Sequence, residues 1–170
     1  QLETFYTSVY HAALHPFVFQ DADGKFRELD KNIGQAEGFT NYTVFSLWDT
    51  YRALHPLFNL IQRDVNADVI RSMLAHYDKS VEKMLPVWSF YGNETWCMIG
   101  YHAVSVIADA IVKDVKGFDY ERAYEAMKIT ALNPHYDCLP EYISLGWVPF
   151  DREKESVSKT LEYACLLYTS

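Results

Sequence analysis

The part of the chain that follows Ser46 is dominated by apolar residues that recur with the period of an α-helix. Such stretches lie near 46–62, 66–80, 94–113, 119–132 and from 156 to the end, and loops rich in Pro, Gly, Asn and aromatic residues separate them. Their lengths and phases differ, so they are not a short tandem repeat. Successive antiparallel helices of this size suit an array of helical hairpins or an α/α toroid. The sequence therefore predicts an all-α fold and disfavours a doubly wound α/β sheet.

The N-terminal part adds one helix and one short hairpin to this pattern. An apolar stripe that includes Phe5 predicts a helix over residues 3–14. The stretch "FVFQDADGKFREL" then alternates around an Asp-Gly turn, which predicts a small β-hairpin over residues 17–27. Asp21 and Asp23 also suggest a calcium loop, but the residues after them lack the ligands and the glycine of an EF-hand. We expect these acids to serve the turn.

Composition and charge narrow the classes of partner. The chain has 170 residues, of which 49% are hydrophobic, so it can fill one sizeable core. Its formal net charge of -8 and the lack of a basic run argue against binding to nucleic acid or to an acidic membrane surface. No apolar run reaches the roughly 18 residues of a membrane-spanning helix. Cys97, Cys138 and Cys165 lack the spacing of a disulfide framework or a zinc knuckle. Small neutral or polar molecules remain plausible ligands.

The two ends suggest a segment of a longer protein. The chain opens with "QLETFYTSVY", which has neither an initiator Met nor a secretory signal sequence. At the other end, the helical start "ESVSKTLEYA" runs into "CLLYTS" without a helix stop signal. These last letters match the translation of a transposase adapter used in sequencing libraries. We therefore expect residues 165–170 to be a non-native tail and residues 1–164 to be a fragment of one catalytic domain.

A single acid stands among apolar and aromatic residues in "FSLWDTYRALHP". A carboxylate in such a context caps a helix, pairs with a cation or accepts hydrogen bonds from a ligand. The form S-x-x-D makes Ser46 and Asp49 a candidate capping box. Alternatively, Trp48 stacks on the apolar face of a sugar ring while Asp49 accepts hydrogen bonds from two adjacent hydroxyls. Arg52, one turn further on, would then hold Asp49 ionised through an i, i+3 ion pair.

A second acid stands beside indoles in "PVWSFYGNETWCMIGYH", where Glu94 lies between Trp88 and Trp96. In a purely structural interpretation, Glu94 lies in the first turn of the helix predicted over 94–113, where its negative charge interacts favourably with the helix dipole. His102 would lie two turns along the same face, which suits a buried, hydrogen-bonded histidine better than a metal ligand. In "SVSKTLEYA", the helical phase does not decide whether Glu162 points inward. Serine-hydrolase, zinc-protease, P-loop and dinucleotide motifs are absent from the sequence.

Several motifs together resemble a known family. In order they are "FYTSVYHAALHP", "DADGKF", "YTVFSLWDTYRALHPLFNLI", "SMLAHY", "LPVW", "YGNETWCMIGYHAVSVIADA", "GFDYERAYEAMK", "GWVP" and "ESVSKTLEYA". Collinear from about residue 3 to 164, they resemble glycoside hydrolase family 92, the calcium-dependent exo-acting α-mannosidases. Members have a β-sandwich followed by an (α/α)6 barrel, so the resemblance implies roughly the first half of that barrel. The family inverts the anomeric centre with an acid and a base, while calcium helps to hold and distort the terminal mannose.

The resemblance implies roles for individual residues. Trp48 and Asp49 match the W-D pair that contributes to the pocket for the terminal mannose. Glu94, with Trp88 nearby, matches a motif that we place at the rim of this pocket. We therefore expect these four residues to bind substrate. In the family, the general acid, the base and the calcium ligands belong to motifs downstream of Ala164. No catalytic or metal-binding residue is thus expected here, and the isolated chain is expected to be inactive.

Two other interpretations stay open. Asp49 and Glu94 can themselves form the carboxyl pair of an activity within this chain. Alternatively, the chain is a non-catalytic carbohydrate-binding or helical interaction module, because a fold alone does not define a function. Under the leading interpretation, the partners are mannose-containing glycans, including N-glycans degraded by bacteria. Family resemblance places the whole protein in the periplasm or outside the cell.

Overall fold

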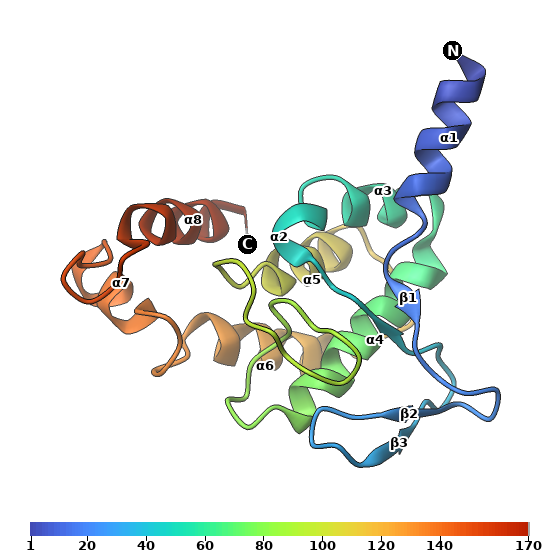
Figure 1. The fold of residues 1–170 in the computed structure, drawn as a ribbon, viewed down its shortest axis with the longest axis horizontal. Helices are drawn as coiled ribbons and strands as arrows, with labels where there is room; N and C mark the ends of the chain where they lie inside the picture. Colours follow the sequence, from blue (N-terminus) through green and yellow to red (C-terminus); the bar gives the residue numbers. More distant parts are fainter. Residues whose placement is uncertain (170) are drawn as a thin grey trace.

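The computed structural model describes residues 1–169. Within these residues the chain forms eight helices and four strands (Figure 1): α1 (Leu2–Ala12), β1 (Phe17–Val18), β2 (Lys25–Arg27), β3 (Ile33–Gln35), β4 (Tyr42–Thr43), α2 (Leu47–Thr50), α3 (Leu54–Ile61), α4 (Arg63–Lys79), α5 (Ala103–Val112), α6 (Tyr120–Ala131), α7 (Leu139–Leu145) and α8 (Ser156–Thr169). The helix-rich fold that the sequence predicts is confirmed, and the described strands form two small antiparallel sheets.

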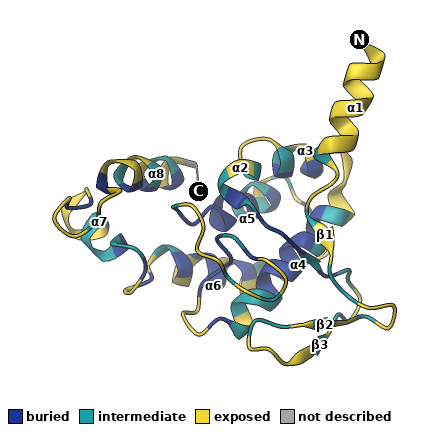
Figure 2. Cartoon of the chain, in the orientation of Figure 1, coloured by how far each residue is buried: buried dark blue, intermediate teal, exposed yellow. Residues whose placement is uncertain are grey.

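The core lies where α4, α5 and α6 pack together, with α3 against α4 and α5. Helix α5, with the sequence AVSVIADAIV, is apolar on nearly every side and is therefore buried; Ile107 and Ala110 are fully covered. Helix α4 contributes Ile70 and Met73, which are also fully covered. Helix α1, by contrast, buries none of its residues and projects away from the other elements (Figures 1 and 2). The packed body of the described chain therefore excludes α1.

The hairpin predicted over residues 17–27 is wrong in its pairing. Strand β1 pairs with β4, and β2 pairs with β3, so the two strands that flank the Asp-Gly turn do not pair with each other. The turn itself forms as expected. The Asp21 backbone N–H donates to the Lys25 carbonyl at 2.8 Å, and Gly24 adopts a φ of +81°. A turn residue specifies the local reversal, whereas strand pairing depends on which edges meet in the tertiary fold.

Helix boundaries differ from the predicted ones at three places. The stretch 46–62 is broken into α2 and α3 at residues 51–53. The stretch 94–113 becomes helical at Ala103 and no earlier, because Trp96, Met98 and Gly100 all adopt positive φ, which an α-helix does not allow. Helix α7 lies in the segment expected to be an irregular loop. Its N-terminal turn holds a proline, which is tolerated there since that N–H has no helical partner.

Helix α8 continues through Cys165 to Thr169. Ser170, the last residue of the expected non-native tail, lies outside the described residues. The adapter origin of residues 165–170 stays a prediction. Among the described helices, none combines the length and the apolar character that a bilayer-spanning segment requires.

Candidate functional site

A cavity of about 910 Å³ opens beside α8, and its walls combine aromatic and charged side chains. Trp48, Trp96 and Tyr136 supply the aromatic surface, while Lys159 and Glu162 of α8 are among the polar residues. Ligand pockets in proteins commonly have this size, with a mostly apolar lining and a few polar groups that orient the ligand. The cavity is therefore the candidate binding site within the described residues.

Helix α2 places Trp48 in the cavity wall and Asp49 outside it. Asp49 is exposed and is not a lining residue. The predicted capping box does not form. Ser46 is the residue before the helix, but its hydroxyl donates to the Asp49 carboxylate at 2.5 Å and caps no backbone N–H. Asp49 therefore keeps most of its acceptor capacity for groups outside the chain. The indole N–H of Trp48 is buried and has no hydrogen-bond partner among the described residues.

Arg52, Glu162 and His102 form a polar chain at the same wall. The ion pair predicted between Arg52 and Asp49 is replaced by one between Arg52 and Glu162, whose atoms lie 3.6 Å apart. The Arg52 guanidinium also lies over the Trp48 ring, 5.2 Å from its centroid. Glu162 in turn contacts the His102 Nε2 at 2.6 Å. The phase of α8 thus points Glu162 toward the cavity, which the sequence did not decide.

His102 is 1% exposed, as expected for a buried histidine with a hydrogen-bond partner. Burial lowers its pKa, although the hydrogen bond and the charge of Glu162 oppose that shift. The prediction that His102 and Glu94 lie on the same face of one helix is wrong, because α5 begins only after His102. The Tyr51 ring lies 4.5 Å from the imidazole, and burial raises the pKa of Tyr51 to about 12. Glu162, His102 and Tyr51 thus pack around Arg52, the residue that contacts the Trp48 ring.

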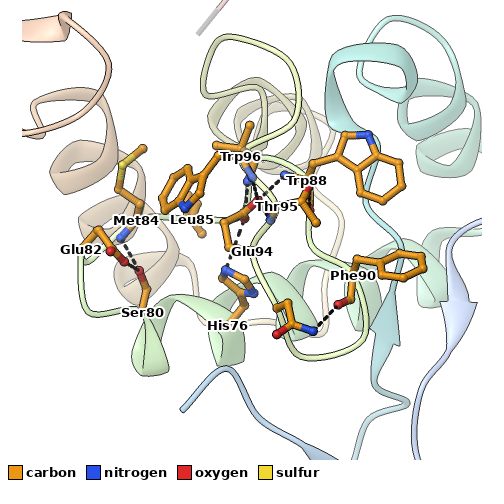
Figure 3. A network of polar contacts seen from close by, with 12 residues as sticks. His76, Ser80, Glu82, Met84, Leu85, Trp88, Phe90, Glu94, Thr95 and Trp96 are labelled. Carbon is orange, nitrogen blue, oxygen red and sulfur yellow. Dashed lines mark hydrogen bonds and ion pairs between the residues drawn. The ribbon is translucent and has the colours of Figure 1, made fainter. Parts of the chain in front are cut away.

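Glu94 is not the first-turn acid of a helix. Its side chain is 5% exposed and accepts hydrogen bonds from the backbone N–H groups of four residues (Figure 3): Val87 at 2.9 Å, Trp88 at 2.8 Å, Thr95 at 2.9 Å and Trp96 at 3.0 Å. The His76 Nε2 lies 3.5 Å from the same carboxylate. Burial raises the pKa of Glu94, and the four amides partly offset the shift. Glu94 is not a lining residue of the cavity, and its oxygens are occupied by the chain itself.

The two indoles of this segment point in different directions from Glu94 (Figure 3). Trp88 is half-buried near Phe90, with ring centroids 6.0 Å apart, and does not line the cavity. Trp96 does line the cavity, 5.7 Å from the Tyr136 ring. The sequence places one indole six residues before Glu94 and the other two residues after it, and this spacing alone did not single out Trp96. Of the four predicted binding residues, only Trp48 lines this cavity, and the substrate role of the four stays a prediction.

The acidic residues near Lys159 do not make a calcium site. The Lys159 ammonium is paired with Asp137 and lies 2.8 Å from Glu153, so a cation already occupies the centre of the group. Burial lowers the pKa of Lys159, but its carboxylate partners outweigh that effect and raise it overall. Across the described part of the chain, no group of three or more His, Cys, Asp or Glu side chains is arranged to hold a metal. These residues therefore do not fit the calcium ion that the sequence resemblance implies.

Comparison with known protein families identifies the class of protein to which this chain belongs. Residues 1–168 match the family model described as the glycosyl hydrolase family 92 catalytic domain, which places the chain in the class of glycosyl hydrolases. It belongs to glycosyl hydrolase family 92. No curated protein matches the chain in a corresponding search.

Two solved bacterial enzymes of this family illustrate the similarity. The α-mannosidase BT3965 of Bacteroides thetaiotaomicron, solved in complex with mannoimidazole, is 81% identical over 98% of this chain, with a TM-score of 0.96. The inverting mannosidase BT2199 of the same species is 34% identical over 98% of this chain, with a TM-score of 0.85. The chain spans 22% of the length of the first enzyme and 23% of the second.

Proposed function

We propose that this chain is part of an inverting, exo-acting α-mannosidase that removes terminal α-linked mannose from glycans, N-glycans among them. The observation that supports this most strongly is the 81% identity to the α-mannosidase BT3965 over nearly the whole chain, at a TM-score of 0.96. At such identity the backbone and most site residues are shared, so the two chains are expected to serve the same kind of substrate.

Within that enzyme, we assign part of the pocket for the terminal mannose to this chain. Trp48 supplies an indole face for the apolar side of the pyranose, and the exposed Asp49 carboxylate accepts hydrogen bonds from sugar hydroxyls. The Arg52 guanidinium over Trp48 fixes the ring from behind. Trp88 and Glu94 belong to the same prediction, but Trp48 has the geometry that supports it best.

The chemistry itself belongs to the longer protein. An inverting glycosidase needs a general acid and a general base about 6.5–9.5 Å apart. The alternative pair, Asp49 with Glu94, is disfavoured because four backbone amides already occupy the Glu94 carboxylate. We therefore propose that acid, base and calcium ligands lie outside this chain, and that the chain alone is inactive. We also propose that the longer protein completes an (α/α)6 toroid, of which this chain is one part, and that it works in the periplasm or outside the cell.

A chimera tests this function. Residues 1–168 replace the matching segment of BT3965, and release of mannose from an aryl α-mannoside is measured in the presence of calcium. We expect the chimera to be active and the isolated 170-residue chain to release no mannose. Asp49→Asn in the chimera should lower kcat/KM by roughly tenfold to a hundredfold, because a hydrogen bond to a charged group is worth about 1.5–3 kcal/mol.

Asp64→Asn is the matched control, since Asp64 is an exposed acid on α4, and we expect it to leave kcat/KM unchanged. A folded chimera that binds mannoimidazole but does not hydrolyse the mannoside would favour the alternative, a non-catalytic carbohydrate-binding module. A chimera that neither binds nor hydrolyses would leave the helical interaction module as the better description. Release of mannose by the isolated chain would contradict the assignment of acid and base to the longer protein.

A further inference from the structure

Glu94 and Trp96 are the two residues whose arrangement the proposed function does not explain. We propose that Glu94 is a positioning residue which holds the Trp96 indole in the cavity wall, where that indole provides a second stacking surface for a sugar ring. The stacking part of this inference rests on the proposed function. The positioning part rests on the contacts of the loop alone, so the two parts can fail separately.

The chain itself engages both oxygens of the buried Glu94 carboxylate. Oε1 accepts from the backbone N–H groups of Trp88, Thr95 and Trp96, and Oε2 accepts from that of Val87, at 2.8–3.0 Å, while the His76 imidazole lies 3.5 Å from Oε2. The donors come from both sides of the loop: Val87 and Trp88 precede it, whereas Thr95 and Trp96 follow it. One buried carboxylate therefore joins the two strands of the loop at its base (Figure 3).

The remainder of the loop is held in ways that do not pass through Glu94. Its tip is a tight turn in which Tyr91 and Gly92 both have positive φ, as a type I′ turn requires. The backbone N–H of Phe90 donates to the Asn93 carbonyl at 2.8 Å. Lys31 donates from its ammonium to the Gly92 carbonyl at 2.6 Å. Loss of the Glu94 contacts should consequently loosen the base of the loop while the tip keeps its own bonds.

Trp96 is the residue at which this base meets the cavity. Its φ of +53° is a conformation that a bulky residue adopts only where the surroundings hold it. The hydrogen bond from its N–H to Glu94 supplies that restraint on the backbone. On the side-chain end, the Tyr136 ring supports the indole, and the Tyr136 hydroxyl donates to the Gly100 carbonyl at 2.9 Å. Trp96 as a whole residue is nevertheless 41% exposed and lines the cavity, so part of its surface is left free to contact a ligand.

The substitution Glu94→Gln separates positioning from simple packing. Glutamine has nearly the same shape, but its NH₂ group must face at least the Val87 N–H, the one donor to Oε2, and a neutral carbonyl replaces the charged acceptor of the Trp88, Thr95 and Trp96 N–H groups. We would label the full chain with 5-fluorotryptophan and record ¹⁹F NMR spectra, with four tryptophan signals assigned by single Trp→Phe variants. The Trp96 and Trp88 signals should shift in Glu94→Gln, while the signal of Trp147, in the segment after α7, should not.

Glu125→Gln serves as the matched control, because Glu125 is an exposed acid on α6, and all four signals should stay in place. An unshifted Trp96 signal in a folded Glu94→Gln chain would overturn the inference. If that variant unfolds, amide hydrogen exchange of the unaltered chain decides the question. Trp96 is an exposed residue whose N–H donates to Glu94, so slow exchange of that amide supports the bond, and exchange at the rate of an unstructured peptide overturns it.

Titration with mannoimidazole then addresses the stacking surface. We expect the Trp48 and Trp96 signals to shift with a common dissociation constant, and the Trp147 signal to stay constant. If mannoimidazole shifts both signals in the unaltered chain but only the Trp48 signal in Glu94→Gln, both parts of the inference are supported. A shift of Trp48 without Trp96 overturns the stacking role of Trp96, while positioning is judged by the variant. No shift of either signal counts against the proposed sugar cavity and leaves the Glu94–Trp96 result to stand by itself.

Discussion

Acidification should destabilise this chain, because two histidines are buried in neutral form. His55 is 1% exposed, and its Nδ1 lies 3.0 Å from the Oδ1 of Asn66. The Nδ2 of Asn66 in turn donates to the Oδ1 of Asn59 at 2.6 Å. Burial lowers the pKa of His55 to about 4, with the Asn66 hydrogen bond opposing the shift. Burial alone lowers the pKa of His76 to about 4. Both side chains are therefore neutral in the folded chain from pH 7 down to near pH 4.

The sign and size of the effect follow from proton linkage. An unfolded histidine has a pKa of about 6.5, so between pH 6.5 and 4 the unfolded chain binds more protons than the folded one, and the free energy of unfolding falls as the pH falls. At 1.36 kcal/mol per pKa unit, a shift to about 4 corresponds to about 3 kcal/mol for each histidine. Two such contributions are comparable to the typical stability of a whole domain, about 5–15 kcal/mol.

Other groups modify this slope. Burial also lowers the pKa of His102, which adds to the loss on acidification. Glu94 acts in the opposite direction: burial raises its pKa, so its contribution is present below the unfolded value of 4.5 and is lost as the pH rises through the folded value. Between the unfolded value and the raised folded value of Glu94, the measured slope should therefore be lower than the histidines alone would give.

Urea unfolding of the full chain at a series of pH values from 7.5 to 4.5, as approximate limits of the histidine window, measures this dependence. We expect a plateau at the upper end and a steady fall below pH 6.5. His76→Gln should make the fall less steep by up to about 1.4 kcal/mol per pH unit, the contribution of one titrating group. His135→Gln is the control, because His135 is exposed, and it should leave the slope unchanged. A stability that is constant across the range, or a His76→Gln slope equal to the parent slope, would refute the linkage argument.

Three substitutions probe other parts of the fold. Gly100→Ala should destabilise by about 2–4 kcal/mol, because Gly100 has a φ of +89° and an added Cβ would lie 2.5 Å from the His102 ring; a stability within error of the parent in urea unfolding would contradict this. Met73→Ala removes a fully covered core side chain of α4 and should lower the free energy of unfolding by about 2–5 kcal/mol, measured as a lower urea midpoint. Val81→Ala, at an exposed residue, is the control; a loss for Met73→Ala smaller than that for Val81→Ala would count against the core assignment. Asp119→Ala removes the side chain that accepts from the Arg122 N–H at the start of α6 and should lower the free energy of unfolding by about 1 kcal/mol. An unchanged free energy of unfolding would contradict a stabilising role of this cap.

Local sequence was sufficient for the elements that are specified by short-range patterns. The helical period after residue 62 predicted α4, α6 and α8 to within a few residues, because an amphipathic or apolar repeat has one face that must be covered. The Asp-Gly turn formed for a similar reason, since Gly24 supplies a positive φ without a steric cost. Motif order was also sufficient to identify the family, which the family match confirmed.

Tertiary structure decided the roles of the charged side chains. Arg52 and Asp49 had suitable helical spacing, yet Arg52 pairs with Glu162, which is distant in sequence. Glu94 stood where a helix start was expected, but the backbone around it turns through positive φ, and its carboxylate joins two loop segments. Periodicity describes which face of an element is apolar, whereas the partner of a charge depends on which elements meet. The sequence alone therefore determined α4, α6, α8 and the family, and the packing of α2, α8 and the loop around Glu94 determined which side chains line the cavity.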